Sequence, residues 1–265
     1  MPPSLSSLPS PTAQSDASGP RTLRLAILET DPENITVCGS FAQLFDNLFT
    51  NTVTQTEEAV ENVGLELVNY NVVKGDYPAK IEEFDGMLIT GSRANAYDDD
   101  KWILDLAAFI RKIFNSSTVR LIGICFGHQI IARALGGTVA PNPAGWEVSV
   151  TTLTLDDAGI GALIFPDIAQ STGGLLRIQE MHSDHVTVLP KGVHVFASSP
   201  KSPVQGMYVP RKILTFQGHP EFNAEVAEAL VDRVIRNGGL TDEQAQDALG
   251  RVGMENHGGR LGRRS

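Results

Sequence analysis

The chain has 265 residues, of which 42% are hydrophobic, so it can bury a large core. Its formal net charge of −10 argues against nucleic acid as a main partner. Two cysteines, Cys38 and Cys125, are too few for a disulfide framework or a zinc site, and no apolar run is long enough to cross a bilayer. These properties predict a soluble protein with no membrane partner.

The first elements follow a low-complexity start. Residues 1–20 are rich in Ser, Pro and Ala and predict disorder, and they have neither the basic start nor the apolar core of a signal peptide. A first strand is expected over residues 23–28. A stripe with helical spacing then predicts an amphipathic helix that lies on a sheet, formed by Phe41, Leu44, Phe45 and Leu48. Cys38, just upstream, is interpreted as a packing residue.

Strands and helices then alternate. Strands are predicted over residues 65–73 and 84–90, and a helix follows the acidic run Asp98-Asp99-Asp100, which we interpret as helix capping rather than metal binding. Alternation of this kind predicts an α/β fold with a mostly parallel sheet, and ligands bind beyond the carboxyl ends of such strands.

Cys125 lies at the turn between the next strand and the next helix. Residues 119–124 are a short buried strand by pattern, and helical spacing begins at Gln129 and ends at Gly136-Gly137. Such a turn projects the thiol from the carboxyl end of a strand towards the positive end of a helix, which favours a thiolate. Most free cysteines are small buried hydrophobes, so Cys125 by itself is a candidate nucleophile and no more.

A second strand-to-turn stretch carries a possible base. Residues 213–217 predict a strand, and the chain continues as Gly218-His219-Pro220-Glu221. His219 and Glu221 share a face if this segment is extended, and Pro220 favours that geometry.

Together, Gly-Ile-Cys125-Phe-Gly-His-Gln129 and Gly-His219-Pro-Glu221 resemble the class I, or triad, glutamine amidotransferases, in particular their GMP synthase-like branch. The resemblance spans residues 22–237 and implies a three-layer, flavodoxin-like fold, with helices on both faces of the sheet and a small antiparallel extension. It also implies that Cys125 attacks glutamine, that His219 acts as base and acid, and that Glu221 orients His219.

The same resemblance implies further site residues. Phe126 and either Gly91 or Ser92 would supply the oxyanion-hole amides, although Ser92-Arg93 replaces the last two residues of the commoner Gly-Gly-Pro turn. For Arg93 two interpretations carry equal weight: a solvated surface charge and a contact to the substrate. The glutamine itself would be bound by Gln129, Ser183, Asp184 and His185.

The remaining elements complete a single domain. Strands are expected over residues 148–155, 193–197 and 206–209, and helices over residues 224–237 and from Thr241 to about Leu249. The last Gly- and Arg-rich residues predict a frayed tail. The chain thus divides into a disordered segment (1–20), an amidotransferase-like domain (21–240) and a short helix with a flexible tail (241–265).

No cofactor or metal is predicted. His182 and His185 have the spacing of helical metal ligands, but neither a thiolate nor a third well-spaced ligand accompanies them. A catalytic thiol also points to a reducing compartment, so the cytoplasm is expected.

The fate of the leaving group stays open at this stage, because the sequence has no P-loop to activate an acceptor. The chain could be a glutaminase that passes ammonia to a separate synthase subunit. It could instead act by itself on glutamine or on a γ-glutamyl peptide or conjugate. A third alternative is a non-catalytic relative with a binding or regulatory role. The acceptor, the pathway and the oligomeric state do not follow from the sequence.

Overall fold

A computed structural model describes residues 21–31, 39–54, 63–156 and 159–261 of the chain. The predictions for residues 1–20 and for Cys38 lie outside the described residues. The strands are β1 Arg21–Glu29, β2 Val63–Asn71, β3 Gly86–Ile89, β4 Arg120–Ile124, β5 Thr138–Pro141, β6 Glu147–Leu155, β7 Leu175–His182, β8 Asp184–Val188, β9 His194–Ser198, β10 Gly206–Val209 and β11 Ile213–Phe216. The helices are α1 Phe41–Thr54, α2 Lys101–Ser116, α3 Phe126–Ala134, α4 Ile160–Ile164, α5 Pro166–Thr172, α6 Ala224–Arg236, α7 Asp242–Arg251 and α8 Gly258–Leu261, with 3-10 turns η2 Val72–Lys74 and η3 Ile81–Glu83.

Nine strands form the main sheet, in the order β2-β1-β3-β4-β11-β10-β9-β6-β7. The pairs from β2 to β11 are parallel, and those from β11 to β7 are antiparallel. Strands β5 and β8 form a separate antiparallel pair. The predicted fold class, a mostly parallel α/β sheet with an antiparallel extension, is confirmed.

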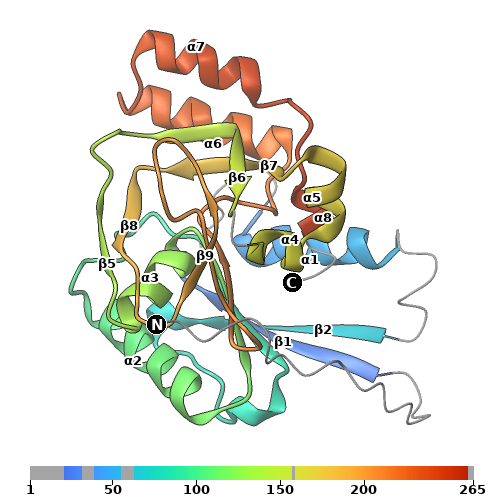
Figure 1. Ribbon diagram of the computed structural model, residues 1–265. Coiled ribbons are helices and arrows are strands. Elements are labelled where there is room, and N and C mark those ends of the chain that lie inside the picture. The colour runs from blue at the N-terminus through green and yellow to red at the C-terminus, as the bar shows by residue number, and fades with distance from the viewer. Residues whose placement is uncertain (1–20, 32–38, 55–62, 157–158, 262–265) are drawn as a thin grey trace.

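Helices cover both faces of the sheet (Figure 1). On one face α2 and α3 pack against alternate strand residues such as Met87, Ile89 and Leu121. On the other face α1, α4, α5 and α8 pack against the intervening residues, among them Ile27 and Leu88. This alternation follows from the two-residue period of strands, and it explains why the central strands are apolar throughout.

The strand register places the carboxyl ends of β3, β4 and β11 side by side. Ile124 of β4 pairs with Phe216 of β11, and Gly123 pairs with Ile89 of β3. The residues that follow these three strands therefore meet at the same edge of the sheet.

Several elements differ from the sequence-based expectation. Residues 160–164 and 166–172 form α4 and α5, and residues 175–182 and 184–188 form β7 and β8, none of which the sequence patterns predict. Asp100 takes the N-cap position of α2 without a side-chain capping bond, and Asp99 instead pairs with Arg133. The helix expected from Thr241 is present as α7, and Thr241 and Gln244 form a capping box at its start.

The tail also differs, up to the last described residue. Composition predicts fraying there, but Leu261 of α8 is fully buried against the face of the sheet that α1 covers. Tertiary contacts order this segment although it has no hydrophobic periodicity.

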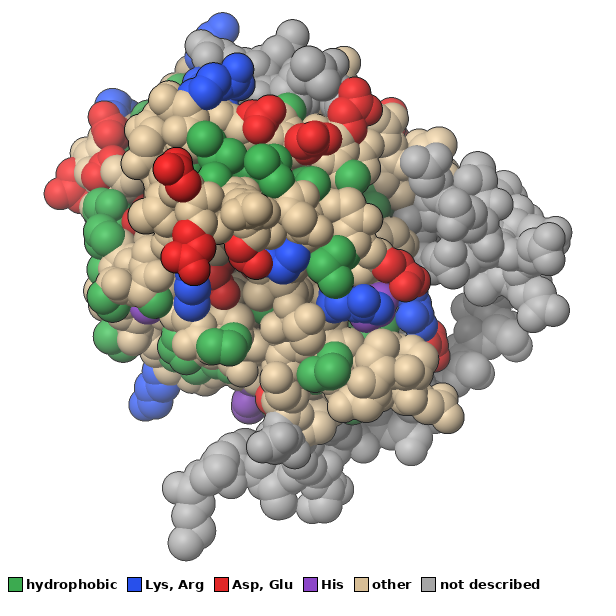
Figure 2. All heavy atoms as spheres, turned by 90° about the horizontal axis from the view of Figure 1, so that it is seen from above, with side chains coloured by type: hydrophobic (Ala, Val, Ile, Leu, Met, Phe, Trp, Pro, Cys, Tyr) green, Lys and Arg blue, Asp and Glu red, His purple; other side chains and the backbone are tan. Residues whose placement is uncertain are grey.

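None of the helices in the described ranges is long and apolar enough to span a lipid bilayer. Figure 2 shows the molecule from above, with acidic and basic side chains spread among polar and hydrophobic ones rather than sorted by sign.

Candidate active site

Cys125 occupies a sharp turn between β4 and α3. Its φ of 53° and ψ of −103° are values that few non-glycine residues adopt. The Cys125 N–H donates to the carbonyl of Phe216 at 2.8 Å, which ties the turn to β11. The Sγ atom lies 3.9 Å from the carbonyl oxygen of Met181, and the residue is 7% exposed. The turn therefore presents the thiol at the N-terminus of α3.

His219 reaches the same edge of the sheet from β11. Its N–H donates to the carbonyl of Gln179 on β7 at 2.7 Å, an isolated antiparallel bridge. Its Nδ1 lies 2.7 Å from Oε1 of Glu221, and both side chains are buried. The structure thus brings together Cys125, His219 and Glu221, which come from two loops about 90 residues apart in sequence.

The charges around His219 favour its protonated form. Burial by itself lowers the pKa of the imidazole, but Glu221 and the sulfur of Cys125 outweigh burial and raise that pKa to about 10. A thiolate at Cys125 and an imidazolium at His219 would therefore stabilise each other as a pair.

Two aromatic rings fix the plane of the imidazole. Phe222 stacks on His219 with ring centroids 3.9 Å apart and an angle of 5° between the planes. Phe41 of α1 lies parallel at a centroid distance of 6.2 Å from both rings. Phe41, the first residue of the apolar stripe of α1, therefore lies next to the histidine. Together with Phe222 it restricts rotation of the imidazole ring.

The loop after β3 borders the imidazole. A Cβ built on Gly91 would lie 3.0 Å from Cε1 of His219 and 2.9 Å from Phe41, so a side chain would crowd the ring. The loop is pinned to the end of β1 because the Thr30 hydroxyl donates to the Gly91 carbonyl at 2.8 Å. The sequence leaves the role of Arg93 open. In the structure its guanidinium makes a two-point contact with the Asp31 carboxylate at 2.6 and 2.8 Å.

The chain is similar in sequence to a known protein family. The model of the glutamine amidotransferase class-I family matches residues 44–236. A glutamine amidotransferase-like protein of Schizosaccharomyces pombe is 33% identical over 86% of this chain and 90% of its own length. The chain belongs to the class I glutamine amidotransferase family.

Other relatives of this amidotransferase-family chain differ in what they do. Gamma-glutamyl peptidase 4 of Arabidopsis thaliana is 32% identical over 67% of this chain and 70% of its own length. The glutamine-hydrolysing GMP synthase of a Parafrankia species is 33% identical over 51% of this chain but over 23% of its own length. A crystal structure of a glutamine amidotransferase from Thermotoga maritima superposes with a TM-score of 0.66 at 19% identity, covering 92% of this chain and 94% of that one, which shows the shared fold.

The residues that the resemblance assigns to substrate binding lie around the first turn of α3. Gln129 is buried, and its Nε2 donates to the carbonyl of Asp184 and to Oε1 of Gln217, each at 3.1 Å. The Ser183 carbonyl accepts from the Asn142 N–H at 2.8 Å. Burial raises the pKa of the Asp184 carboxyl, and burial lowers the pKa of His185.

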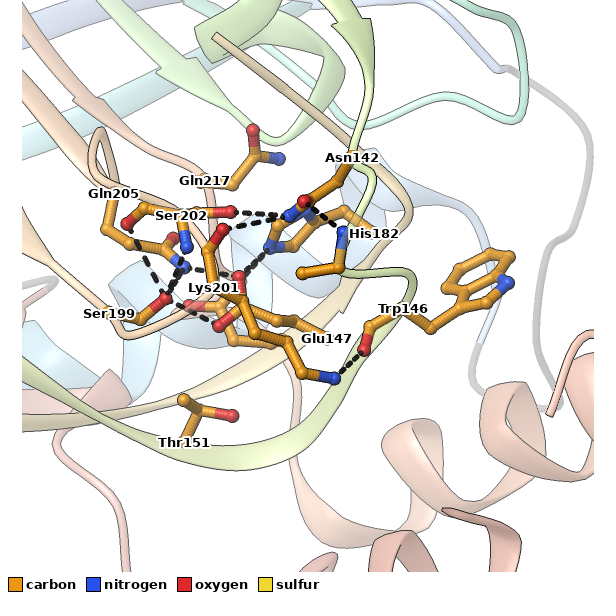
Figure 3. A network of polar contacts seen from close by, with 12 residues as sticks. Asn142, Trp146, Glu147, Thr151, His182, Ser199, Lys201, Ser202, Gln205 and Gln217 are labelled. Atoms are coloured by element: carbon orange, nitrogen blue, oxygen red, sulfur yellow. Dashed lines mark hydrogen bonds and ion pairs between the residues drawn. The ribbon is translucent and has the colours of Figure 1, made fainter. Parts of the chain in front are cut away.

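A buried ionic network that no sequence motif indicates centres on His182, which also feels the charge of Cys125. Figure 3 shows His182 with Glu147 and the polar residues around them. His182 Nδ1 donates to the Asp184 carbonyl at 2.8 Å, and its Nε2 is 3.3 Å from a carboxylate oxygen of both Glu147 and Glu180. Both ring nitrogens thus face oxygen atoms, an arrangement that favours an imidazolium. Burial opposes that charge, but Glu147 and Glu180 outweigh it and, with Cys125, raise the pKa of His182 to about 10.

The two carboxyls of this network differ in their own partners. Glu147 accepts from the Ser199 hydroxyl at 2.6 Å and from Gln205 Nε2 at 2.9 Å (Figure 3). Burial opposes ionisation of Glu147, but His182 and the Ser199 hydroxyl outweigh burial and lower its pKa. Burial instead raises the pKa of Glu180, which is packed against Gly218, the residue before His219. Of the two carboxyls, Glu147 is therefore the one whose surroundings favour the ionised form.

Proposed function

We propose that this chain hydrolyses γ-glutamyl amides through a covalent thioester on Cys125. The observation that carries the proposal is the meeting of Cys125, at its strained turn, with the buried His219–Glu221 pair. A nucleophile, a base and a group that orients the base are the parts that thiol acyl transfer needs.

The reaction follows from these positions. The Cys125 thiolate attacks the γ-carbonyl carbon, and the carbonyl oxygen becomes an oxyanion. The His219 imidazolium then protonates the departing nitrogen as the C–N bond breaks, which leaves the thioester. Water, deprotonated by His219, attacks the thioester carbonyl, and glutamate leaves as the thiol of Cys125 is restored.

The oxyanion hole is assigned to the amides of Phe126 and of Gly91 or Ser92. These amides make no hydrogen bond to any residue in the described part of the chain, so each can donate to an incoming oxygen. Loss of one such donor typically costs about a hundredfold or more in rate.

The glutamyl end of the substrate is assigned to Gln129 and to residues 183–185. Asp184 would pair with the α-ammonium group, and backbone and side-chain groups of Ser183 and His185 would hold the α-carboxylate. Both hydrogens of the Gln129 amide already face protein acceptors, so its carbonyl oxygen is the part left for substrate.

Relatives favour a γ-glutamyl peptide or conjugate as the substrate class. The similarity to a gamma-glutamyl peptidase spans 70% of that protein, whereas the similarity to GMP synthase spans 23% of that one. A second candidate function is a glutaminase subunit that passes ammonia to a separate synthase, since GMP synthase is among the relatives. Either activity needs a reduced thiol, so we expect the cytoplasm as its location.

The test compares purified chain on glutamine and on γ-glutamyl dipeptides, with glutamate release as the assay. A higher kcat/KM for the dipeptides supports the peptidase, and a higher value for glutamine supports the glutaminase. Cys125→Ala should abolish turnover and leave the Tm nearly unchanged. Absence of turnover on every γ-glutamyl compound, with no labelling of Cys125 by an electrophilic glutamine analogue, would leave a binding or regulatory role. Unfolding of Cys125→Ala would mean that the thiol is needed for packing.

A further inference from the structure

The C-terminal strap, which we define as residues Val252–Leu261, lies beyond the part of the chain that the family model matches, residues 44–236. It runs along β7, the last strand of the sheet, which among the described residues has a strand neighbour on one side only. A strand edge of this kind exposes N–H and C=O groups that need partners. The strap supplies some of those partners.

The strap and the catalytic histidine share this edge of β7. The Arg177 N–H donates to Nδ1 of His257 at 2.9 Å, and the His257 N–H donates back to the Arg177 carbonyl at 2.8 Å. Two residues further along, the Gln179 carbonyl accepts from the N–H of His219 at 2.7 Å. Arg177 and Gln179, two residues apart on β7, therefore fix the position of the strap relative to the loop that carries His219.

The side chain of Gln179 makes a second link. It is buried, and its Nε2 donates to the Val252 carbonyl at 2.8 Å. The same residue thus binds His219 through its backbone and the start of the strap through its side chain.

The strap also contacts the short segment between the histidine and the glutamate. A Cβ built on Gly258 would lie 2.5 Å from the carbonyl oxygen of Pro220 and 3.2 Å from the carbonyl carbon of Pro220. The two backbones are therefore in direct contact. Leu261, three residues later, is fully buried in the cluster that includes Cys125 and Phe45. The strap is therefore anchored on both sides of its contact with Pro220.

We propose that the C-terminal strap is a positioning element of the active site, which holds the Pro220 backbone so that His219 and Glu221 stay aligned with Cys125. It rests on the function proposed above, and it assigns Gly258 and Gln179 as positioning residues. The strap touches no reacting atom. It acts through Pro220, whose displacement would lengthen or misdirect the 2.7 Å bond between His219 and Glu221. Misplacement by about 1 Å can cost about a hundredfold in rate.

Two adjacent glycines supply a matched pair of variants. Gly258→Ala places a methyl group against the Pro220 carbonyl, whereas Gly259→Ala meets no atom within 4 Å. Both substitutions fall in the same short helix, α8, so their intrinsic effects on helix stability are alike. We expect Gly258→Ala to lower kcat about tenfold or more with KM within about twofold, and Gly259→Ala to match wild type.

The pH profile of Cys125 alkylation by iodoacetamide gives a second readout that needs no substrate. Only the thiolate reacts, so a misaligned His219 should move the profile of Gly258→Ala to higher pH than that of Gly259→Ala. A lower Tm with an unchanged profile and unchanged kcat would mean that the strap is merely structural, and would overturn the proposal.

A milder variant covers the case in which Gly258→Ala does not fold. Gln179→Met keeps the side-chain volume and removes the bond to Val252, and it should lower kcat and shift the alkylation profile in the same direction. Wild-type kinetics and a wild-type profile in folded Gln179→Met would then overturn the proposal. If wild type itself turns over no γ-glutamyl compound, the proposed function fails, and the alkylation profiles still decide whether the strap positions His219.

Discussion

His219 and Glu221 lie two residues apart and are joined by a 2.7 Å hydrogen bond from Nδ1 to Oε1, with Pro220 between them. The carboxylate accepts the Nδ1 hydrogen and leaves Nε2 for proton exchange. A buried carboxylate in this position fixes the tautomer of the imidazole and stabilises the imidazolium that forms during the reaction.

Glu221→Gln should therefore lower kcat about a hundredfold or more and change KM little, because orientation and charge at the base matter chiefly in the transition state. Initial rates over a range of substrate concentrations give both constants. The control is Glu225→Gln, which removes an exposed carboxylate from the first turn of α6 and should leave both constants unchanged. A kcat for Glu221→Gln within about twofold of wild type would remove Glu221 from the catalytic assignment.

Phe222 stacks on His219 at 3.9 Å, and we expect Phe222→Leu to loosen the imidazole. Aromatic contacts of this kind are worth about 1 kcal/mol beyond area burial, so the Tm should fall by a few degrees and kcat by about fivefold. Phe165→Leu is the matched control: Phe165 is equally buried but packs against Phe196 and Phe216 in the core. It should lower the Tm and spare kcat, and an equal loss of kcat in both variants would contradict the role of the stack.

The geometry around Cys125 and around His219 could be predicted from sequence because it is largely local. A buried strand followed at once by a helix dictates a turn at Cys125, and a His-Pro-Glu segment dictates that base and carboxylate share one face. The fold class followed from the alternation of strands and helices.

The parts that sequence did not predict depend on long-range register. His182 meets Glu147 because β6 pairs with β7 in a register that no local pattern specifies. Arg93 meets Asp31 across two loops, and the strap is ordered by contacts with β7 and Pro220 rather than by its own composition. For Phe222, a signal was present: it directly follows Glu221 and could have been assigned to the histidine.

Arg93→Lys tests whether the loop after β3 must be held rigidly. Lysine keeps the charge but not the two-point contact with Asp31, so the loop that carries Gly91 and Ser92 should move more freely. We expect kcat to fall about threefold to tenfold through a less ordered oxyanion hole. Arg120→Lys, at an exposed position on β4, should behave as wild type. A loss that appears in KM alone would instead indicate that Arg93 contacts the substrate.

The imidazolium of His182 predicts a specific dependence of stability on pH. The pKa of His182 is raised to about 10 in the folded protein by Glu147 and Glu180, against an ordinary value of 6.5. Because the folded-state pKa lies above the unfolded one, the stabilisation is fully present below about pH 6.5 and is lost as the pH rises through about 10.

His182→Gln removes this titration. The part of the difference in unfolding free energy between wild type and His182→Gln that comes from this titration should therefore be full below about pH 6.5 and shrink from there towards about pH 10, by at most about 1.4 kcal/mol per pH unit. Urea unfolding at a series of pH values measures it, and subtraction of the two curves cancels the contribution of His219, which both proteins share. A difference that stays constant across the pH series would mean that His182 is neutral in the fold, and its two carboxyl neighbours would then have to share a proton between them.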